Sequence, residues 1–596
     1  MLYPTGMPSR TGAAHVVTTT RKYKDQVYRT HLLRRSYREG GAVKNETLGN
    51  LSHLPEALID VIRRSLQGET FVPFGQAFEI IRSRTHGHVQ AVSAAMQRLS
   101  MTTLLASQPC REREWVLAMV SSRILAPHTK LATTRWWHTT TLAEDFGVAD
   151  ASEDDLYAAM DWLLARQDRV QKKLAARHLH EGGLVLYDLS SSYFEGSTCP
   201  LAKRGYSRDG KTGTLQVNYG LMTDAQGCPV AVSVHEGNTA DSTTFMPAVR
   251  SLREAFGIEH VVMVGDRGMV SQKAIDEMRD SDGLGWITAL KSGSIRALVE
   301  QSQLQLGLFD ERNLVEIASP DYPGERLVAC RNDALAKLRA HKREALLTGT
   351  ERDLVKIVER IEADKLKAQV KGSRRTLLKA KEAIGVQVGK IINRHKMAKH
   401  FELQIDDAKL SWQRRADSIA GEAALDGIYI IRTSVTAAQM DAPQCVRNYK
   451  ALANVERAFR SIKTIDLKVR PIHHRLADRV RAHILLCMLA YYVEWHMREA
   501  WRELMFADTD QLAKTSRDPV APAERSDEAR DKAASHLLPD GTPAHSFATL
   551  MAHLATIVRN TCRTLPAEAG TPTFEVTTTS NALQQRALGL VQAIKL

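Results

Sequence analysis

Two short apolar runs in the middle of the chain each lead into an aspartate. Residues 184–189 read LVLYDL and contain Asp188, and residues 261–266 read VVMVGD and end in Asp266. Runs of this length that are rich in Val and Leu and lie beside glycine are typical of buried strands. The sequence therefore predicts two apolar strands that each end in a carboxylate at one edge of a sheet.

The segments around these runs predict the rest of the sheet. Residues 215–224 and 229–238 alternate like strands and are joined by a turn at 224–227, and residues 286–290 (WITAL) form a further strand. A helix over 242–256 precedes the second aspartate-bearing run. Three antiparallel strands followed by alternating helix and strand indicate an α/β fold with a mixed sheet.

Helical periodicity dominates the chain before the sheet. Residues 56–66 place apolar side chains on one broad helical face, and residues 88–180 have helical apolar spacing with few Gly and Pro. Ser152, followed by three acidic residues, predicts a helix start. Residues 1–85 also hold a basic stretch, which is consistent with a DNA-reading module and equally with an exposed appendage.

The chain after the sheet predicts long basic helices over 330–385, with breaks at 348–350 and 372–373. Residues 401–414 alternate like a hairpin that turns at 406–407, and residues 428–431 form a buried strand.

Further helices are expected towards the C-terminus, over 449–463 and 473–501. Residues 515–545 are rich in Pro, Asp, Arg and Ser and predict a flexible linker. Two amphipathic segments follow it.

The charge of the chain is concentrated. The net charge is +13, and residues 331–400 hold 19 basic and 8 acidic residues. Such a surface attracts a polyanion, although a solvated helical face would give the same count. The seven cysteines stand singly, which indicates neither a zinc cluster nor a disulfide framework. The longest apolar run, 483–495, is too short to span a bilayer, and we expect a cytoplasmic protein.

The two aspartates predict metal chemistry. Hard carboxylate oxygens hold Mg²⁺, and two Mg²⁺ ions neutralise the attacking and leaving oxygens in phosphodiester chemistry. The alternative is that Asp188 and Asp266 are ordinary cap or turn residues.

A third acid strengthens the metal hypothesis. Residues 449–463 read YKALANVERAFRSIK, so that Glu456 lies among Arg457, Arg460 and Lys463 on neighbouring helical turns. This pattern suits a metal ligand beside phosphate-binding cations. An amphipathic helix with Glu–Arg pairs would give it too.

These residues carry a resemblance to bacterial insertion-sequence transposases of the DDE type, in the cut-and-paste subgroup marked Y-x2-R-x3-E-x6-K. Tyr449, Glu456 and Lys463 match that signature, while Leu452 stands where it has Arg. The segments SYREGGAVKN, GNTAD, LDGIYIIRT and LKVRPIHHR match a branch of the group, and the resemblance covers roughly residues 30–505.

The resemblance implies an RNase H-like core interrupted by an insertion, and the long stretch between Asp266 and Glu456 accommodates one. The expected parts are an N-terminal DNA-binding region (1–87), a helical domain (88–182), the core in two pieces (183–300 and 421–505), a basic helical and hairpin insertion (301–420), and a linker with a C-terminal helical region (506–596).

The resemblance also implies the activity: binding of the element's terminal inverted repeats, DNA cleavage, and joining of the 3′ ends to target DNA. Asp188, Asp266 and Glu456 would hold two Mg²⁺ ions, for which Mn²⁺ can substitute. Tyr449 and Lys463 would hold phosphates around a hairpin intermediate. The expected partners are double-stranded DNA and a second copy of the chain in a synaptic complex, near the bacterial nucleoid and not at a membrane.

Further DNA contacts are expected from Arg457, Arg460, His473 and Trp412. Trp412, in the predicted hairpin, would stack on a flipped base, though packing in a core weighs more heavily for a Trp. Two alternative functions share the same fold: a catalytically inactive DNA-binding descendant, and a structure-specific nuclease that cleaves without joining.

Overall fold

The computed structural model describes residues 12–24, 26–71, 73, 77–305, 309–310, 313–368, 378–511, 516–565, 567 and 570–596. The chain divides into two compact units. One comprises Met1–Ser83 with Arg559–Thr577, and the other comprises Arg84–Val558 with Thr578–Leu596. No helix in the described ranges is long and apolar enough to cross a membrane.

The smaller unit contains an antiparallel sheet of β1 (Ala14–Tyr23), β2 (Gln26–Glu39) and β3 (Ala42–Asn50). The basic stretch of the sequence therefore lies on β2 and β3. Helix α1 (Glu56–Leu66) confirms the predicted helix and buries Ile59. The order β17–β16–β4 makes a second sheet, from β4 (Phe78–Thr85), β16 (Val558–Thr564) and β17 (Thr573–Thr577).

The larger unit begins with the predicted helical region, which is confirmed. Its helices are α2 (Gly87–Arg98), α3 (Met101–Leu105), α4 (Arg111–Leu125), α5 (Lys130–Trp136), α6 (Leu142–Asp145), α7 (Glu153–Leu164) and α8 (Gln167–His178). Ser152 caps α7 as expected, because its hydroxyl accepts from the Asp155 amide (3.2 Å) while the Asp155 carboxylate accepts from the Ser152 amide (2.8 Å).

The central sheet has the predicted mixed topology. Its core strands are β5 (Gly183–Tyr193), β7 (Leu215–Asp224), β8 (Pro229–Glu236), β9 (Val261–Val264) and β10 (Leu284–Ala289). They lie in the order β8–β7–β5–β9–β10. The β5–β7 and β7–β8 pairs are antiparallel, and the β5–β9 and β9–β10 pairs are parallel. This arrangement, with the two-residue β6 (Lys203–Arg204) beside β7, is RNase H-like.

Between β8 and β9 lie α9 (Asp241–Arg250) and a π-helical turn, η3 (Ser251–Ala255), where one helix was expected. α10 (Gln272–Arg279) precedes β10, and α11 (Ser292–Glu300) follows it.

Three later strands extend the sheet beyond β10. The strand predicted around 428–431 is β15 (Ile428–Thr433), which pairs with β10 and with β12 (Arg326–Arg331), and β11 (Leu314–Ile317) pairs with β12. A buried ion pair holds this extension, because Arg432 Nε donates to Glu325 Oε2 at 2.6 Å. The Trp286 indole donates to the same oxygen at 3.3 Å.

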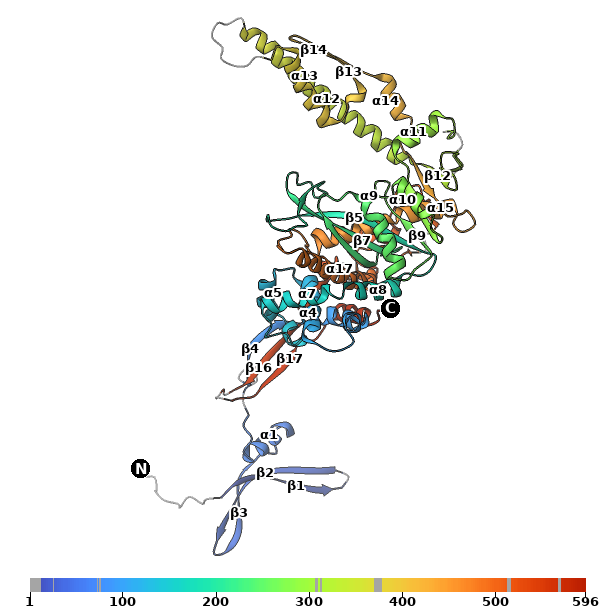
Figure 1. Cartoon of the computed structure of the whole chain (residues 1–596). Coiled ribbons are helices and arrows are strands. Elements are labelled where there is room, and N and C mark those ends of the chain that lie inside the picture. Colours follow the sequence, from blue (N-terminus) through green and yellow to red (C-terminus); the bar gives the residue numbers. More distant parts are fainter. Residues whose placement is uncertain are drawn as a thin grey trace. The chain divides into compact units, whose positions relative to one another are not determined.

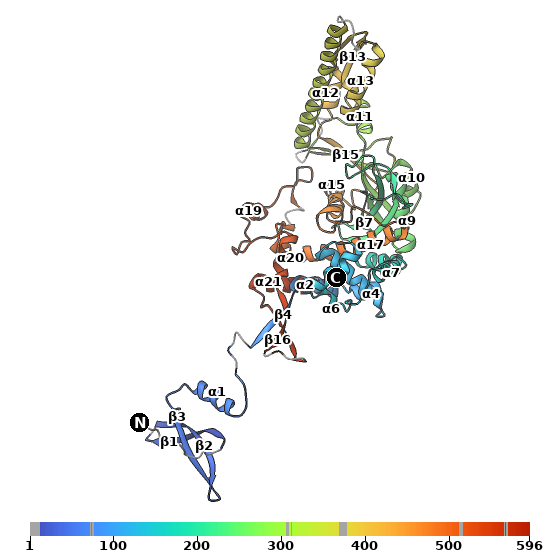
Figure 2. The ribbon, with the colours of Figure 1, turned by 90° about the vertical axis from the view of Figure 1, so that its left-hand side faces the viewer.

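The insertion contains α12 (Asp333–Ala368), α13 (Lys381–His395), the hairpin of β13 (Phe401–Asp406) and β14 (Lys409–Arg414), and α14 (Ala416–Ala423). The figures show these elements together as a projection beyond β15 (Figure 1, Figure 2). Its helices and hairpin share an apolar core of their own, with Leu354, Ile384, Val388 and Phe401 buried.

Two predictions within the insertion are wrong in detail, and one cannot be compared. Helix α12 continues through 348–350, where a break was predicted. The buried Thr350 hydroxyl donates to the Leu346 carbonyl (2.7 Å), so that it is satisfied within the helix. The hairpin turns at Asp407–Ala408, since Asp406 pairs with Lys409. The break expected at 372–373 lies outside the described residues.

The helix expected over 449–463 is also wrong as a single element. The structure has α15 (Ala442–Lys450), α16 (Leu452–Arg460) and a π-helical turn, η5 (Ser461–Ile465), with a break at Ala451. α15 buries Cys445 and Val446, whereas α16 buries Val455 and Phe459. The break gives each helix its own apolar face.

Helix α17 (Ala477–Ala500) is buried along most of its length and packs against α4, α7 and β8 (Figure 1). It begins at Ala477, four residues later than predicted. The linker expected over 515–545 is wrong in part: it contains α19 (Asp527–Ser535), capped by the Ser526 hydroxyl. The tail carries α20 (Phe547–Ala555) and α21 (Ala582–Gln592).

Candidate active site

The sheet register places Asp188 and Asp266 side by side. Strands β5 and β9 are parallel, and Leu186 lies opposite Val264. Asp188 lies two residues after Leu186, and Asp266 lies two residues after Val264. The sequence predicted that Asp188 ends its strand. This prediction is wrong, because β5 continues to Tyr193 in its pairing with β7. Only Asp266 follows a strand end.

Helix α16 brings the third acid to the same region. The helix packs against β5, and its buried face includes Phe459, whose ring centroid lies 5.7 Å from that of Tyr219 on β7. Glu456 is on the exposed face of this helix. Its charge acts on Asp188 together with that of Asp266. The fold therefore gathers all three predicted acids into one electrostatically coupled group.

The pKa of Asp188 shows the balance of forces. Burial raises this pKa to about 7, and repulsion from Asp266 and Glu456 adds to the rise. The amide of Leu189, which donates to Asp188 Oδ1 at 2.8 Å, and the guanidinium of Arg208 act in the opposite direction. A cation between the carboxylates would remove the repulsion.

The donor set fits a hard divalent cation. In the described part of the chain none of the three carboxylates forms an ion pair with a basic side chain. Asp266 accepts hydrogen bonds from the Tyr449 hydroxyl and from the Gly268 amide, both at 3.4 Å. Three carboxylates that form no direct ion pair can offer their oxygens to Mg²⁺.

The raised pKa of Asp188 predicts that metal binding depends on pH. The carboxyl is protonated below about pH 7, and a proton competes with the cation. We expect the affinity for Mn²⁺, measured by calorimetry, to rise between pH 6 and pH 8. In EDTA the sign for stability is opposite: the native state holds a proton that the unfolded state releases near pH 4, so stability falls as pH rises towards 7. An Asp188→Asn variant whose Mn²⁺ affinity and stability depend on pH as in the wild type would contradict this assignment.

The two signature positions on α15 and α16 differ in character. Tyr449 is half-buried and bonded to Asp266, and burial with the nearby Asp266 charge raises its pKa. Leu452 is partly buried and packs against the main core. Its apolar side chain thus takes a structural place at the position where an Arg was expected.

Lys463, which was predicted to bind a phosphate, forms an ion pair within the chain. Its side chain is buried, its Nζ lies 2.6 Å from Asp209 Oδ1, and it donates to the Ser190 hydroxyl on β5 at 3.2 Å. Asp209 also pairs with Arg470 and accepts from the Tyr193 amide at 3.1 Å. Asp209 lies in the glycine-rich loop after β6, and no motif in the sequence marks it as a partner of Lys463.

The remaining predicted DNA contacts are scattered. Arg457 and Arg460 are exposed on α16, and Arg457 contacts Asn454 at 3.4 Å. His473 is exposed, and its Nδ1 lies 3.8 Å from a Glu195 carboxylate oxygen. Trp412 is half-buried and packs against the core of the insertion.

Basic cavities that the sequence did not reveal adjoin the acids. A cavity of about 290 Å³ is lined by Asp266, Tyr449, Arg267 and Arg339. A neighbouring cavity of about 480 Å³ shares Arg267 and Arg339 and adds Arg296 and Lys342. The cations come from segments far apart in sequence. No local motif marks them.

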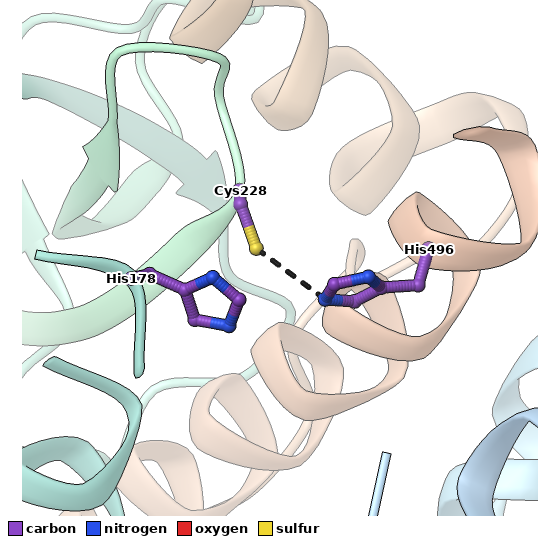
Figure 3. A group of neighbouring side chains, drawn as sticks. All are labelled: His178, Cys228 and His496. Carbon is purple, nitrogen blue, oxygen red and sulfur yellow. Dashed lines mark hydrogen bonds between the residues drawn. The ribbon is translucent and has the colours of Figure 1, made fainter. Parts of the chain in front are cut away.

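A separate cluster joins His178, Cys228 and His496, and the ligand atoms of these residues all lie within 4.8 Å of one another (Figure 3). Cys228 Sγ is 3.8 Å from His496 Nε2, and His178 Nε2 is 3.0 Å from the Tyr492 hydroxyl. Sulfur and imidazole ligands suit Zn²⁺ rather than Mg²⁺. The cluster arises only in the fold, and its chemistry is unlike that of the three acids.

Comparisons with known proteins identify the family of the chain. The chain matches the family model for a transposase DDE domain over residues 183–493, and that for the N-terminal domain of IS1634 family transposases over residues 16–72. No curated protein matches it. Among solved structures it is similar to a cryo-EM structure of a piggyBac transposase synaptic complex with hairpin DNA, at 9% identity and a TM-score of 0.34, covering 77% of this chain and 84% of that one.

Proposed function

The chain belongs to the DDE transposases of insertion sequences, and from that premise we propose that it binds the terminal inverted repeats of its element, cleaves DNA there and joins the 3′ ends to target DNA. The observation that carries the proposal is the convergence of Asp188, Asp266 and Glu456 from two adjacent parallel strands and a helix packed on them.

The three carboxylates would hold two Mg²⁺ ions, which supply charge neutralisation at the attacking and leaving oxygens. Tyr449 positions Asp266 through its hydroxyl. Arg267 lies next to that aspartate and lines the same cavity, where it can bind a phosphate of the DNA strand. Lys463, which pairs with Asp209, donates to the Ser190 hydroxyl and so stabilises the middle of β5.

Several finer features belong to the same proposal. The unit with β1–β3 would serve as the N-terminal DNA-binding region, and the insertion as a second DNA-contacting part. Because both element ends must be brought together, we expect a homodimer in the synaptic complex. Excision through a hairpin intermediate follows from the subgroup resemblance.

The experiment uses a labelled element end, identified from inverted repeats beside the coding region, together with a target plasmid and Mg²⁺. A transposase yields both cleaved ends and joined products. Cleavage without joining would instead indicate a structure-specific nuclease, and binding alone an inactive DNA-binding descendant. Either result would contradict the proposed activity.

The basic cavities predict a specific electrostatic effect. We expect Arg296→Gln with Lys342→Gln to weaken binding of element-end DNA and to reduce the slope of log affinity against log salt by about two, one for each phosphate that the variant no longer neutralises. The measurement is a salt titration of binding anisotropy.

The matched control replaces Arg343 and Lys399, which line the same cavity but pair with Asp426 and Glu422. Because these cations are already neutralised, their replacement should change the salt slope less. An equal change in both double variants would contradict a phosphate role for Arg296 and Lys342.

A further inference from the structure

A third basic cavity, whose lining includes none of the three acids, lies in the larger unit. Its volume is about 440 Å³, and it is bounded by Arg123 on α4, Lys130 on α5, His483 on α17 and the segment from Lys468 to His474. None of the described residues that line it is acidic. Three elements from distant parts of the chain thus build a pocket of one charge sign.

Lys130 is the central feature of this pocket. Its side chain is only 5% exposed, and in the described ranges no ion pair or hydrogen bond engages its ammonium group. Burial and, after it, the neighbouring charge of Arg123 lower its pKa to about 7. A buried ammonium without a partner is costly, and a bound anion would favour its charged form.

Arg123 is the charged group that acts most strongly on Lys130. Arg123 is 8% exposed, its guanidinium donates to the carbonyls of Leu467 (3.4 Å) and His128 (3.5 Å), and among the described residues it forms no ion pair. His483 is buried, and its Nδ1 has no hydrogen-bond partner among the described residues. Burial and the charges of Lys130 and Arg123 lower the pKa of His474 to about 3.

We propose that this cavity is a binding site for a phosphate group. A phosphate would supply the missing negative charge and acceptor oxygens for Lys130 and Arg123. The polar side chains that line it, from α4, α5, α7, α17 and the segment before α17, are cations, imidazoles and hydroxyls. The cavity is wide enough for a phosphate with its attached sugar.

The position of the cavity indicates the source of the phosphate. Lys468 and Arg470 line it and also line a cavity of about 370 Å³ that contains Lys463, next to β5. A nucleic-acid strand that leaves the three acids along this path would place a backbone phosphate at Lys130. This assignment of the source rests on the proposed function, whereas the pocket for a phosphate does not.

The test uses the full-length protein and Lys130→Met. Without ligand, the variant should have a higher melting temperature than the wild type, because it removes an unpaired buried charge. Inorganic phosphate should raise the melting temperature of the wild type and leave that of the variant unchanged. Binding of element-end DNA should weaken about tenfold, as expected for the removal of a hydrogen bond to a charged group.

Lys532→Met is the matched control. Lys532 is 2% exposed, but its Nζ lies 2.7 Å from Glu528. Its replacement should lower the melting temperature and preserve the response to phosphate and DNA. Lys130→Gln, which keeps a polar end, is measured beside Lys130→Met in case the latter does not fold.

The outcomes separate the pocket from its source. Loss of the phosphate response with weaker DNA binding supports a DNA phosphate. Loss of the phosphate response with unchanged DNA binding supports the pocket and assigns it to a free phosphate. An unaltered phosphate response in both Lys130 variants overturns the proposal. Failure of the wild type to bind or cleave element ends would overturn the proposed function, and the phosphate arm would still decide the pocket.

Discussion

Replacing Glu456 with Gln should abolish cleavage and joining together while leaving DNA binding intact. The amide keeps the shape of the side chain but removes the charge that helps to hold a divalent cation beside Asp188 and Asp266. We expect a loss of about a thousandfold or more, because several kcal/mol of transition-state stabilisation are at stake and each 1.4 kcal/mol is about tenfold. Gel shift and cleavage of a labelled end in Mg²⁺ measure the two properties.

The control for this variant is Glu195→Gln. Glu195 is an exposed acid near His473, and it is not among the groups that act most strongly on Asp188. Its amide variant should cleave and bind as the wild type does. Near-normal cleavage by the Glu456 variant would mean that another residue is the third acid, and a failure to bind would mean that Glu456 mainly orders its helix.

Among the substitutions proposed for this chain, Asp209→Ala should lower the free energy of unfolding most. The carboxylate is buried, with its side chain 1% exposed, and it neutralises both Lys463 and Arg470. Removing it leaves two largely buried cations uncompensated, which costs about 3–5 kcal/mol in comparable buried pairs. Urea unfolding of the full chain measures the change.

A matched variant is Asp241→Ala, which removes the partner of Arg208 at a more exposed site, with the Asp241 side chain 41% exposed. Exposed pairs contribute about 0–1 kcal/mol, so the loss should be small. Similar losses for Asp209 and Asp241 would show that the burial of the Lys463–Asp209–Arg470 group does not determine its contribution.

The core sheet was predictable because its signals are local. Each of β5, β7, β8, β9 and β10 shows an apolar run near a turn residue and lies where the pattern places a strand, whereas the two-residue β6 falls in a predicted loop. The extension through β15, β12 and β11 was less visible, since the pairing of β10 with β15 joins segments separated by the whole insertion. Register and pairing partner are not encoded in a strand's own composition.

The candidate site was predictable in its acids and not in its cations. Asp188, Asp266 and Glu456 stand in recognisable patterns, and the fold gathers them. The pairing of Lys463 with Asp209 could not be predicted, because Asp209 lies in a distant loop. The break at Ala451 was missed because one helical period runs through the whole segment, while the tertiary contacts of Phe459 and Val446 require separate faces.

The most direct test of the central claim maps the metal site chemically. Fe²⁺ bound in place of Mg²⁺ generates hydroxyl radicals with ascorbate and peroxide, and these cut the backbone next to the ion. We expect cuts near residues 188, 266 and 456, which Mg²⁺ competes away and Asp266→Asn removes. Cuts confined to the neighbourhood of His178, Cys228 and His496, or cuts at the acids that persist in Asp266→Asn, would contradict it.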